Sequence, residues 1–211
     1  MFIDLTNENV SFENLKVGIP SSLKYRDIEL TDVTVMGQWP FTIADSNVTI
    51  SNSDYLFLQP SGQSTVSLID SHMCEFIPRD FFGTMIFENG LWTTAGEILG
   101  NIPHHSMEND FTIKGSLKIE GVRENLQWKD AQVTREYEVI VKGENGIKGA
   151  LIKIDGNTYV TDNTGKVKFS LILNESNYIE PKKLEVFEGE NLISQKEIDF
   201  FTETPITIIK D

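Results

Sequence analysis

The sequence has one cysteine, few basic residues and no long apolar run, and each shortage excludes a class of structure or partner. Cys74 alone cannot close an intrachain disulfide, so a hydrophobic core must stabilise the fold. No stretch approaches the roughly 18 consecutive apolar residues of a membrane-spanning helix, and we expect no membrane span. Because 18 basic residues oppose 32 acidic ones, the formal net charge is −14, which argues against nucleic acid as a partner.

Helix signals are scarce as well, because no apolar pattern with the helical period continues beyond two turns. Apolar and polar residues alternate instead, as in Val33–Val35, Val48–Ile50 and Val139–Val141. Gly, Asn, Asp and Ser separate these short runs. The pattern predicts an all-β protein.

Residues 1–135 carry a loose repeat, in which an apolar pair is followed by a polar corner of Asp, Ser or Asn and then by a second alternating strand. Its copies are Leu30–Val35, Ile43–Ile50, Leu68–Phe76, Ile86–Trp92, Ile113–Ile119 and Leu126–Val133. The copies lie roughly 15 to 25 residues apart, a spacing typical of solenoids, in which stacked units bury a continuous core. From about residue 25 to residue 135, the chain resembles a short right-handed parallel β-helix of the pectate-lyase-like type. An irregular antiparallel β-sandwich is the alternative for the same pattern.

Residues 136–211 differ in composition and in strand pattern. Their nine basic residues are all lysine and they contain no tryptophan, whereas residues 1–135 hold all four arginines and all three tryptophans. Seven short strands are predicted at 137–142, 150–154, 158–161, 166–173, 183–188, 193–200 and 206–209. So many strands in so short a segment predict an immunoglobulin-like β-sandwich. We therefore predict two domains, a β-solenoid at 1–135 and a β-sandwich at 136–211.

A family resemblance covers the second domain. Glu144–Ile154 followed by Tyr159–Phe169 resembles the carboxypeptidase regulatory-like (transthyretin-like) family, with Ile147 and Lys148 where Pro-Val is usual. The resemblance implies a seven-stranded sandwich that is a non-catalytic module of an exported multidomain protein. Met1–Leu5 lacks the basic and apolar regions of a signal peptide. We expect an extracellular or cell-surface chain cut from a longer one, with a cytoplasmic or virion location as the alternative.

Carboxylates on the predicted solenoid are the candidate catalytic residues. Asp32, Asp45 and Asp70 occupy similar corners of the repeat, so they are predicted to stack into one row. Glycosidases need acids about 5 to 10 Å apart, and Ca²⁺ beside a basic residue is the other arrangement to consider. Stacked like charges repel, so such a row would need a cation or a raised pKa. Turn residues that face water are the alternative, and no cofactor other than Ca²⁺ is suggested.

Three tryptophans are candidates for carbohydrate binding. Trp39, Trp92 and Trp128 would each offer a platform to a sugar ring if their side chains were exposed. Core packing is the alternative role of all three.

The histidines and the cysteine carry weaker signals. His104, His105 and Glu108 lie in a predicted loop and could bind a divalent metal, although adjacent imidazoles point apart in an extended chain. A solvated loop is the alternative. His72 and Cys74 lie in a strand-like run, where we expect a structural histidine and a buried, inert thiol.

These observations favour a non-catalytic structural or binding protein of a cell-surface or extracellular assembly, with a glycan or a surface protein as its partner. A carbohydrate-active enzyme that uses the solenoid carboxylates is one alternative, and a phage tail or virion component is the other. The sequence does not predict the oligomeric state.

Overall fold

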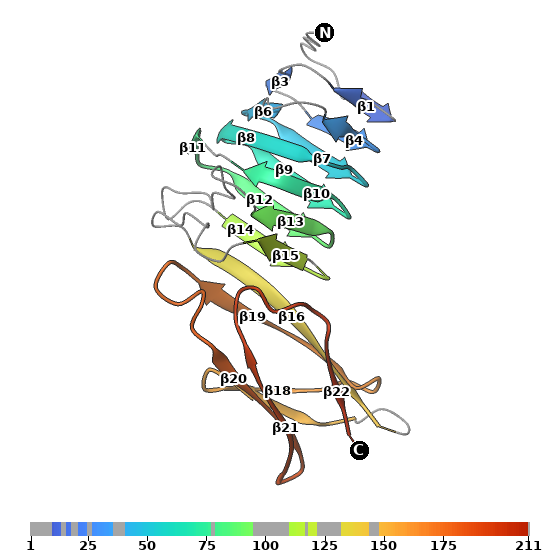
Figure 1. Ribbon diagram of the computed structural model, residues 1–211, viewed down its shortest axis with the longest axis vertical. Coiled ribbons are helices and arrows are strands. Elements are labelled where there is room, and N and C mark those ends of the chain that lie inside the picture. Colours follow the sequence, from blue (N-terminus) through green and yellow to red (C-terminus); the bar gives the residue numbers. More distant parts are fainter. Residues whose placement is uncertain are drawn as a thin grey trace.

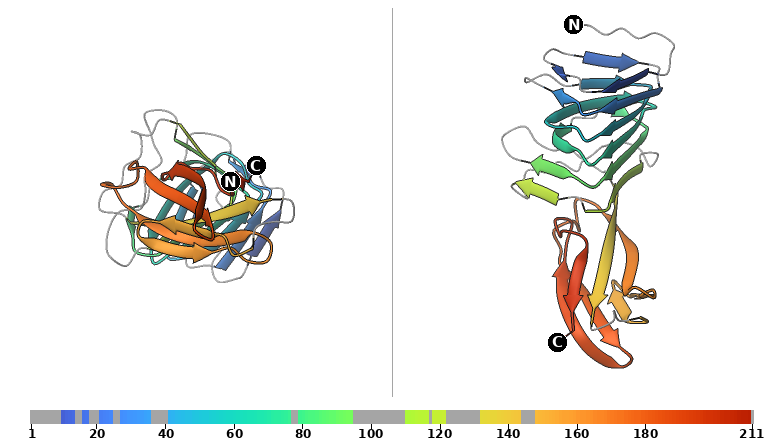
Figure 2. Two further views of the ribbon diagram at one scale, coloured as in Figure 1. Left: turned by 90° about the horizontal axis from the view of Figure 1, so that it is seen from below. Right: turned by 90° about the vertical axis from the view of Figure 1, so that its right-hand side faces the viewer.

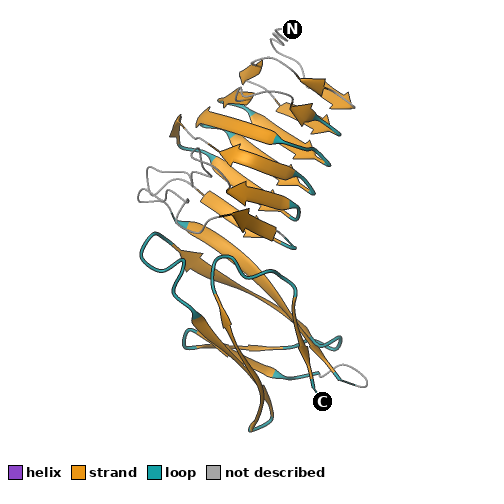
Figure 3. Ribbon diagram, in the orientation of Figure 1, coloured by secondary structure: helices purple, strands orange, loops and turns teal. Residues whose placement is uncertain are grey.

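The computed structural model describes residues 10–13, 16–17, 21–24, 27–35, 41–76, 79–94, 110–116, 118–121, 132–143 and 148–210. All regular structure in these residues is β-strand (Figure 3). The prediction of an all-β chain is therefore confirmed. Among the same residues there is no helix with the length and apolarity needed to cross a membrane.

Before β16, the chain alternates between two parallel sheets (Figure 1). The larger, nine-stranded sheet runs in the order β1-β4-β7-β9-β12-β14-β16-β19, with β22 also paired to β16. Its strands are β1 (Val10–Glu13), β4 (Asp27–Thr31), β7 (Asn47–Ser51), β9 (Thr65–Ile69), β12 (Thr84–Glu88), β14 (Asp110–Lys114), β16 (Val133–Lys142), β19 (Lys166–Leu173) and β22 (Ile206–Ile209).

The seven-stranded sheet faces the nine-stranded one (Figure 2) and runs in the order β15-β13-β10-β8-β6-β3, with β11 on β8. Its strands are β3 (Ser21–Lys24), β6 (Phe41–Ala44), β8 (Leu56–Gly62), β10 (His72–Phe76), β11 (Arg79–Phe81), β13 (Leu91–Thr94) and β15 (Lys118–Gly121). A short pairing joins β2 (Lys16–Val17) to β5 (Thr34–Val35).

Neighbouring strands of these parallel sheets lie one repeat apart in the sequence. In the nine-stranded sheet the step ranges from 18 residues, between Val10 and Ile28, to 26 residues, between Met85 and Phe111. The described strand pairs from β4 to β16 in this sheet stay in register, so equivalent inward side chains stack on one another. The two stacks are Ile28, Val48, Val66, Met85, Phe111 and Val133, and Leu30, Ile50, Leu68, Phe87, Ile113 and Arg135.

These stacks form the core between the two sheets. Every apolar member is at most 2% exposed. Full burial of such a side chain contributes about 1.5–3 kcal/mol, so the stacks are the main source of stability in this part of the chain. On the opposite sheet, Met73 pairs with Leu56 on one side and with Trp92 on the other, and all three side chains are buried.

Several corners between the sheets have a left-handed residue followed by a buried serine. Asn52 and Asp70 have φ of 48°, a conformation that Asn and Asp tolerate better than most residues. Buried serines follow them, and the Ser53 amide donates to Ser71 Oγ (3.2 Å) while the Val33 amide donates to Ser53 Oγ (3.0 Å). The serine ladder thus satisfies backbone amides that would otherwise be buried without partners.

Strand β16 continues from the stacked sheets into the last part of the chain. Val133–Arg135 pair with β14, and Val139–Lys142 pair with β22 on the same side. Val133–Ile140 pair with β19 on the other side. The predicted boundary between residues 135 and 136 therefore falls inside a strand that is shared by both parts.

All seven strands predicted between residues 137 and 209 are present, with their ends shifted by a few residues. Four of them form a separate sheet in the order β18-β17-β20-β21. Its strands are β17 (Leu151–Ile154), β18 (Asn157–Val160), β20 (Lys182–Glu188) and β21 (Asn191–Ile198). This sheet packs against the β16–β19 part of the nine-stranded sheet, where the Tyr159 and Phe169 rings lie 5.3 Å apart between centroids.

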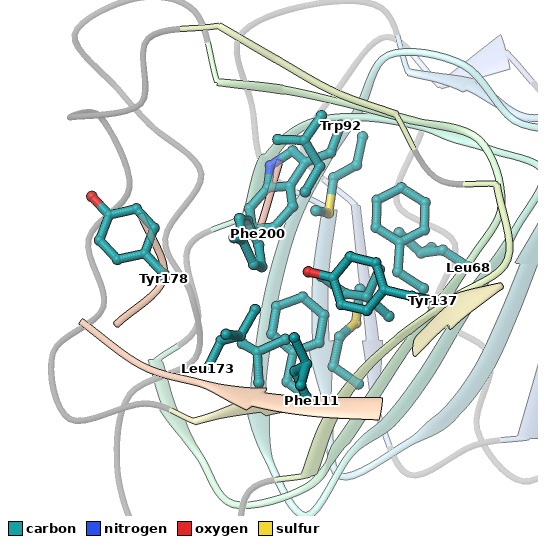
Figure 4. Close-up of a cluster of buried hydrophobic side chains, with 14 of the residues drawn as sticks. Leu68, Trp92, Phe111, Tyr137, Leu173, Tyr178 and Phe200 are labelled. Carbon is teal, nitrogen blue, oxygen red and sulfur yellow. The ribbon is translucent and has the colours of Figure 1, made fainter. Parts of the chain in front are cut away.

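An aromatic cluster fills the junction around β16 (Figure 4). The Trp92 ring lies 6.0 Å from Phe111 and 6.4 Å from Phe200, and Phe200 lies 6.4 Å from Tyr178. Since Trp92 and Phe111 come from the stacked sheets while Tyr178 and Phe200 come from the C-terminal part, the two parts share one core.

Arg135 occupies the last position of an otherwise apolar stack and is 0% exposed. Its Nη2 donates to the Thr202 carbonyl at 3.4 Å, and its guanidinium lies 5.5 Å from the centroid of the Tyr137 ring. Burial lowers the pKa of Arg135 and raises that of Tyr137, whose hydroxyl donates to the Asp199 carbonyl at 2.8 Å. These polar contacts tie β16 to the segment that precedes β22.

Candidate functional site

The predicted row of carboxylates is not present. Asp32 and Asp70 follow strands of the nine-stranded sheet, whereas Asp45 follows β6 of the seven-stranded sheet, at the opposite corner. Asn52 occupies the position between Asp32 and Asp70, because the strands that precede these three residues are neighbours. At a strand spacing of about 4.8 Å, the two aspartates are roughly 10 Å apart along the sheet. An amide therefore separates the like charges.

The sequence predicts such a row because Ile43–Ile50 and Leu68–Phe76 look like equivalent copies of the repeat, although they are offset by half a repeat. Leu68–Phe76 spans the corner from the nine-stranded to the seven-stranded sheet, but Ile43–Ile50 spans the return corner. Both corners show the same local pattern because both need a residue with positive φ followed by a buried serine. Asp45 has φ of 49°, and the amide of the buried Ser46 donates to Ser64 Oγ at 3.2 Å.

The candidate catalytic aspartates have backbone roles that account for them. The amide of Asp32 donates to the Ser51 carbonyl at 3.1 Å, and that of Asp70 donates to the Glu88 carbonyl at 3.0 Å. Asp45 uses its side chain too, since its Oδ1 accepts from the Gln63 amide at 3.1 Å. Among the described residues, no group of three or more His, Cys, Asp or Glu side chains is placed to hold a metal ion.

The expectation that Trp92 offers a platform to sugars is wrong, because its side chain is 0% exposed. It is part of the inward-facing row of the seven-stranded sheet and packs in the junction core (Figure 4). The remaining predicted sugar-binding residues, Trp39 and Trp128, lie outside the described residues, as do the predicted metal ligands His104, His105 and Glu108.

A different set of side chains comes together on the outer face of the seven-stranded sheet, and we call it the His72 patch. It consists of Tyr55, His72, Cys74, Leu91 and Thr93. His72 pairs with Leu91 across β10 and β13, and the Tyr55 ring lies 5.3 Å from the imidazole between centroids, tilted by 54°. Tyr55 is 60% exposed and is the most exposed aromatic side chain among the described residues.

Within the patch, the imidazole Nε2 of His72 is the centre of a small polar group. It lies 3.2 Å from Thr93 Oγ1 and 3.6 Å from Cys74 Sγ. His72 and Cys74 are both half-buried, so the expectation of a fully buried thiol is wrong. An imidazole and a hydroxyl can exchange hydrogen bonds with a ligand, and an exposed aromatic ring can stack on one.

Strand alternation could have indicated this pair from the sequence. Met73 lies between His72 and Cys74, and an apolar Met73 that points inward leaves both neighbours on the outer face. The contacts of His72 with Tyr55 and Thr93 could not be predicted from strand alternation, because they depend on which strands become neighbours.

Comparison of the chain with protein-family models, with curated proteins and with solved structures found no match.

Proposed function

We propose that the chain is a short right-handed parallel β-helix followed by an immunoglobulin-like or transthyretin-like β-sandwich. Three observations support this architecture: strands alternate between two parallel sheets, inward side chains stack in register, and a four-stranded sheet packs on the β16–β19 strands. The resemblance of Glu144–Ile154 and Tyr159–Phe169 to the carboxypeptidase regulatory-like family agrees with it.

We further propose that the protein is a non-catalytic structural and binding component of a cell-surface or extracellular assembly. The observation that carries this proposal is β16, which hydrogen-bonds to β14, β19 and β22 and so belongs to both parts of the chain. A shared strand and the shared aromatic core hold the two parts in a fixed relation. A rigid body with separate outer sheet faces is suited to displaying a binding surface at a set distance from its attachment.

The binding surface in this proposal is the His72 patch, and its ligand is a carbohydrate. An exposed tyrosine ring stacks on the apolar face of a sugar, while an imidazole and a threonine hydroxyl can exchange hydrogen bonds with sugar hydroxyls. His72 and Thr93 provide the two polar groups on the adjacent strands β10 and β13, and Tyr55 provides the ring from the corner that precedes β8. The patch takes over the role that the sequence suggested for Trp92.

A glycan array probed with the intact chain tests the proposal. We expect Tyr55→Asn to abolish glycan binding, since it removes the ring while asparagine tolerates the φ of 58° at this position. Phe82→Ala is the matched control, because Phe82 is also an exposed aromatic residue (39%) but is not part of the patch. The absence of any glycan bound by the wild type, or full binding by Tyr55→Asn, would contradict the proposal.

A further inference from the structure

The outer face of the four-stranded sheet carries an apolar row that crosses all four strands. Leu151 pairs with Val160 on one side and with Phe187 on the other, and Phe187 pairs with Leu192. Their neighbours Ile152 and Val186 are buried, so strand alternation places this row on the outside. Val160 is 56% exposed and Leu192 is 50% exposed.

A polar row runs parallel to the apolar one, at the next outward-facing position of each strand. Its members in strand order are Thr158, Lys153, Glu185 and Gln195. This row has one positive and one negative side chain, so the face is neutral in a chain whose formal net charge is −14. A second copy of the chain would meet no net repulsion here. Glu185 also contacts Lys183 of its own chain.

The outer face of the other sheet in this part of the chain carries charged side chains in place of an apolar row. Its charges already pair within the chain, since Lys168 Nζ contacts Glu136 Oε1 at 3.0 Å and Lys166 Nζ lies 4.0 Å from Glu138 Oε1. The apolar row is thus a property of the four-stranded sheet and not of exposed strands in general.

From the register of these two rows we infer that the four-stranded sheet is a self-association surface, on which two copies of this chain pack face to face about a twofold axis. The axis would run midway between β17 and β20, about 15° from the strand direction, which is half of the roughly 30° at which packed sheets cross. It places Leu151 of one copy opposite Phe187 of the second copy, and Val160 opposite Leu192 of the second copy. In the polar row, Lys153 meets Glu185 of the second copy, and the reciprocal contact forms as well.

In an isologous interface one patch must complement itself. The proposed pairing meets this condition, because apolar side chains lie opposite apolar ones and each charge lies opposite one of the other sign. Packed sheets cross at about 30°, which separates the outer pairs but leaves the central ones together, because β17 and β20 flank the axis. Lys153 also shields the apolar centre in the single copy, since its Nζ lies 4.6 Å from the centroid of the Phe187 ring.

The dimer is expected to be weak. Four strands at a spacing of about 4.8 Å give a face roughly 14 Å wide between the outer strand axes. Two rows of side chains on such a face bury less than the about 800 Å² per partner of a standard interface. We therefore expect a concentration-dependent dimer, which sedimentation equilibrium on the full chain can measure.

Reversing the charge of Lys153 or Glu185 tests the proposed dimer. Recovery of association when the two variants are mixed cannot result from a change in the stability of a single copy. Lys153→Glu and Glu185→Lys each place like charges opposite one another at two points of the dimer, and each should weaken self-association at least about tenfold. A mixture of the two variants restores both complementary contacts and should form a heterodimer about as stable as the wild-type dimer. Lys142→Glu makes the same charge change at the exposed end of β16 and should leave association unchanged.

Thermal unfolding of each variant shows whether it is folded. A wild type that remains monomeric up to millimolar concentration would overturn the inference. Single variants that associate as well as the wild type would also overturn it, as would a mixture that forms no heterodimer.

Discussion

Replacing Gly90 with alanine should destabilise the protein, because the new Cβ would clash with backbone atoms and a backbone segment would have to move. Gly90 has φ of +91° at the corner between β12 and β13. An added Cβ would lie 2.1 Å from the Ser71 carbonyl oxygen and 2.7 Å from the Ser71 nitrogen, both of which are backbone atoms. The Leu91 amide donates to the same Ser71 carbonyl at 3.0 Å, so any shift that makes room also weakens this hydrogen bond.

A glycine at the next equivalent corner separates this clash from simple backbone strain. Gly115 has φ of +65°, and its added Cβ would lie 2.1 Å from Asn89 Oδ1, the end of a side chain that can rotate away. The rotation costs the 2.9 Å hydrogen bond from the Ser116 amide to that oxygen. Both variants thus combine a strained alanine with a weakened hydrogen bond, but only Gly90→Ala forces two backbone segments apart.

The magnitudes follow from these terms. Left-handed strain costs about 1–3 kcal/mol and a weakened hydrogen bond about 1 kcal/mol, so Gly115→Ala should cost about 2–4 kcal/mol. Gly90→Ala should cost about 2 kcal/mol more than Gly115→Ala, since the displacement of packed backbone is added. Thermal unfolding followed by circular dichroism should show a difference in Tm of about 4–8 °C between the variants, at about 2–4 °C per kcal/mol. Equal shifts in Tm would refute the argument, because they would mean that the corner relaxes freely.

Three further outcomes are expected. Leu68→Ala should lower the free energy of unfolding by about 2–5 kcal/mol because Leu68 is fully buried, whereas Ile69→Ala, on the outward side of the same strand, should cost much less, as chemical denaturation will show. Tyr137→Phe should cost about 1 kcal/mol at neutral pH through the lost hydrogen bond. Burial raises the pKa of Tyr137 above its ordinary value of 10.0, so wild-type stability falls as the pH rises above that value, and the variant should lose less over the same pH range in paired denaturation curves. Hydrogen bonds from the Thr164 hydroxyl and then from the amides of Lys166 and Thr164 lower the pKa of Asp162. The ionised Asp162 therefore stabilises the fold above its ordinary pKa of 3.8, and this stabilisation is lost at more acidic pH. The free energy of unfolding of Asp162→Asn should depend less on pH in that acidic range, as denaturation curves at several pH values will show.

Local alternation was enough to predict the strands but not their neighbours. The strand from residue 166 to 173 could be read from its two-residue period, and the structure has it at the same residues. The alignment of Ile43–Ile50 with Leu68–Phe76 failed because the two corners share one local pattern, and only long-range register tells them apart. The same register decides that Trp92 faces inward, beside Met73 and Ile119.

The boundary between the two parts also could not be predicted from the local sequence pattern. Composition changes near residue 135, yet β16 runs through that position because its first residues complete one set of pairs and its last residues begin another. A strand with two sets of partners looks like any other ten-residue alternating segment in the sequence. The His72 patch was missed for a related reason, since its members are supplied by two strands, β10 and β13, and by the corner that precedes β8.

The double membership of β16 also bears on how the chain reaches its native state. Its pairing with β19 is longer than its pairings with β14 and β22, although the joined residues lie 26 to 40 positions apart, from Ile140 with Lys166 to Val133 with Leu173. If the C-terminal part forms first, the first residues of β16 remain as an open edge. That edge is a ready template for β14, and each strand added there exposes a new edge to the one before it. Growth from a preformed end would replace many improbable nucleation events with one, and the slow step of folding should therefore respond to mutations around β16 more than to mutations near β4.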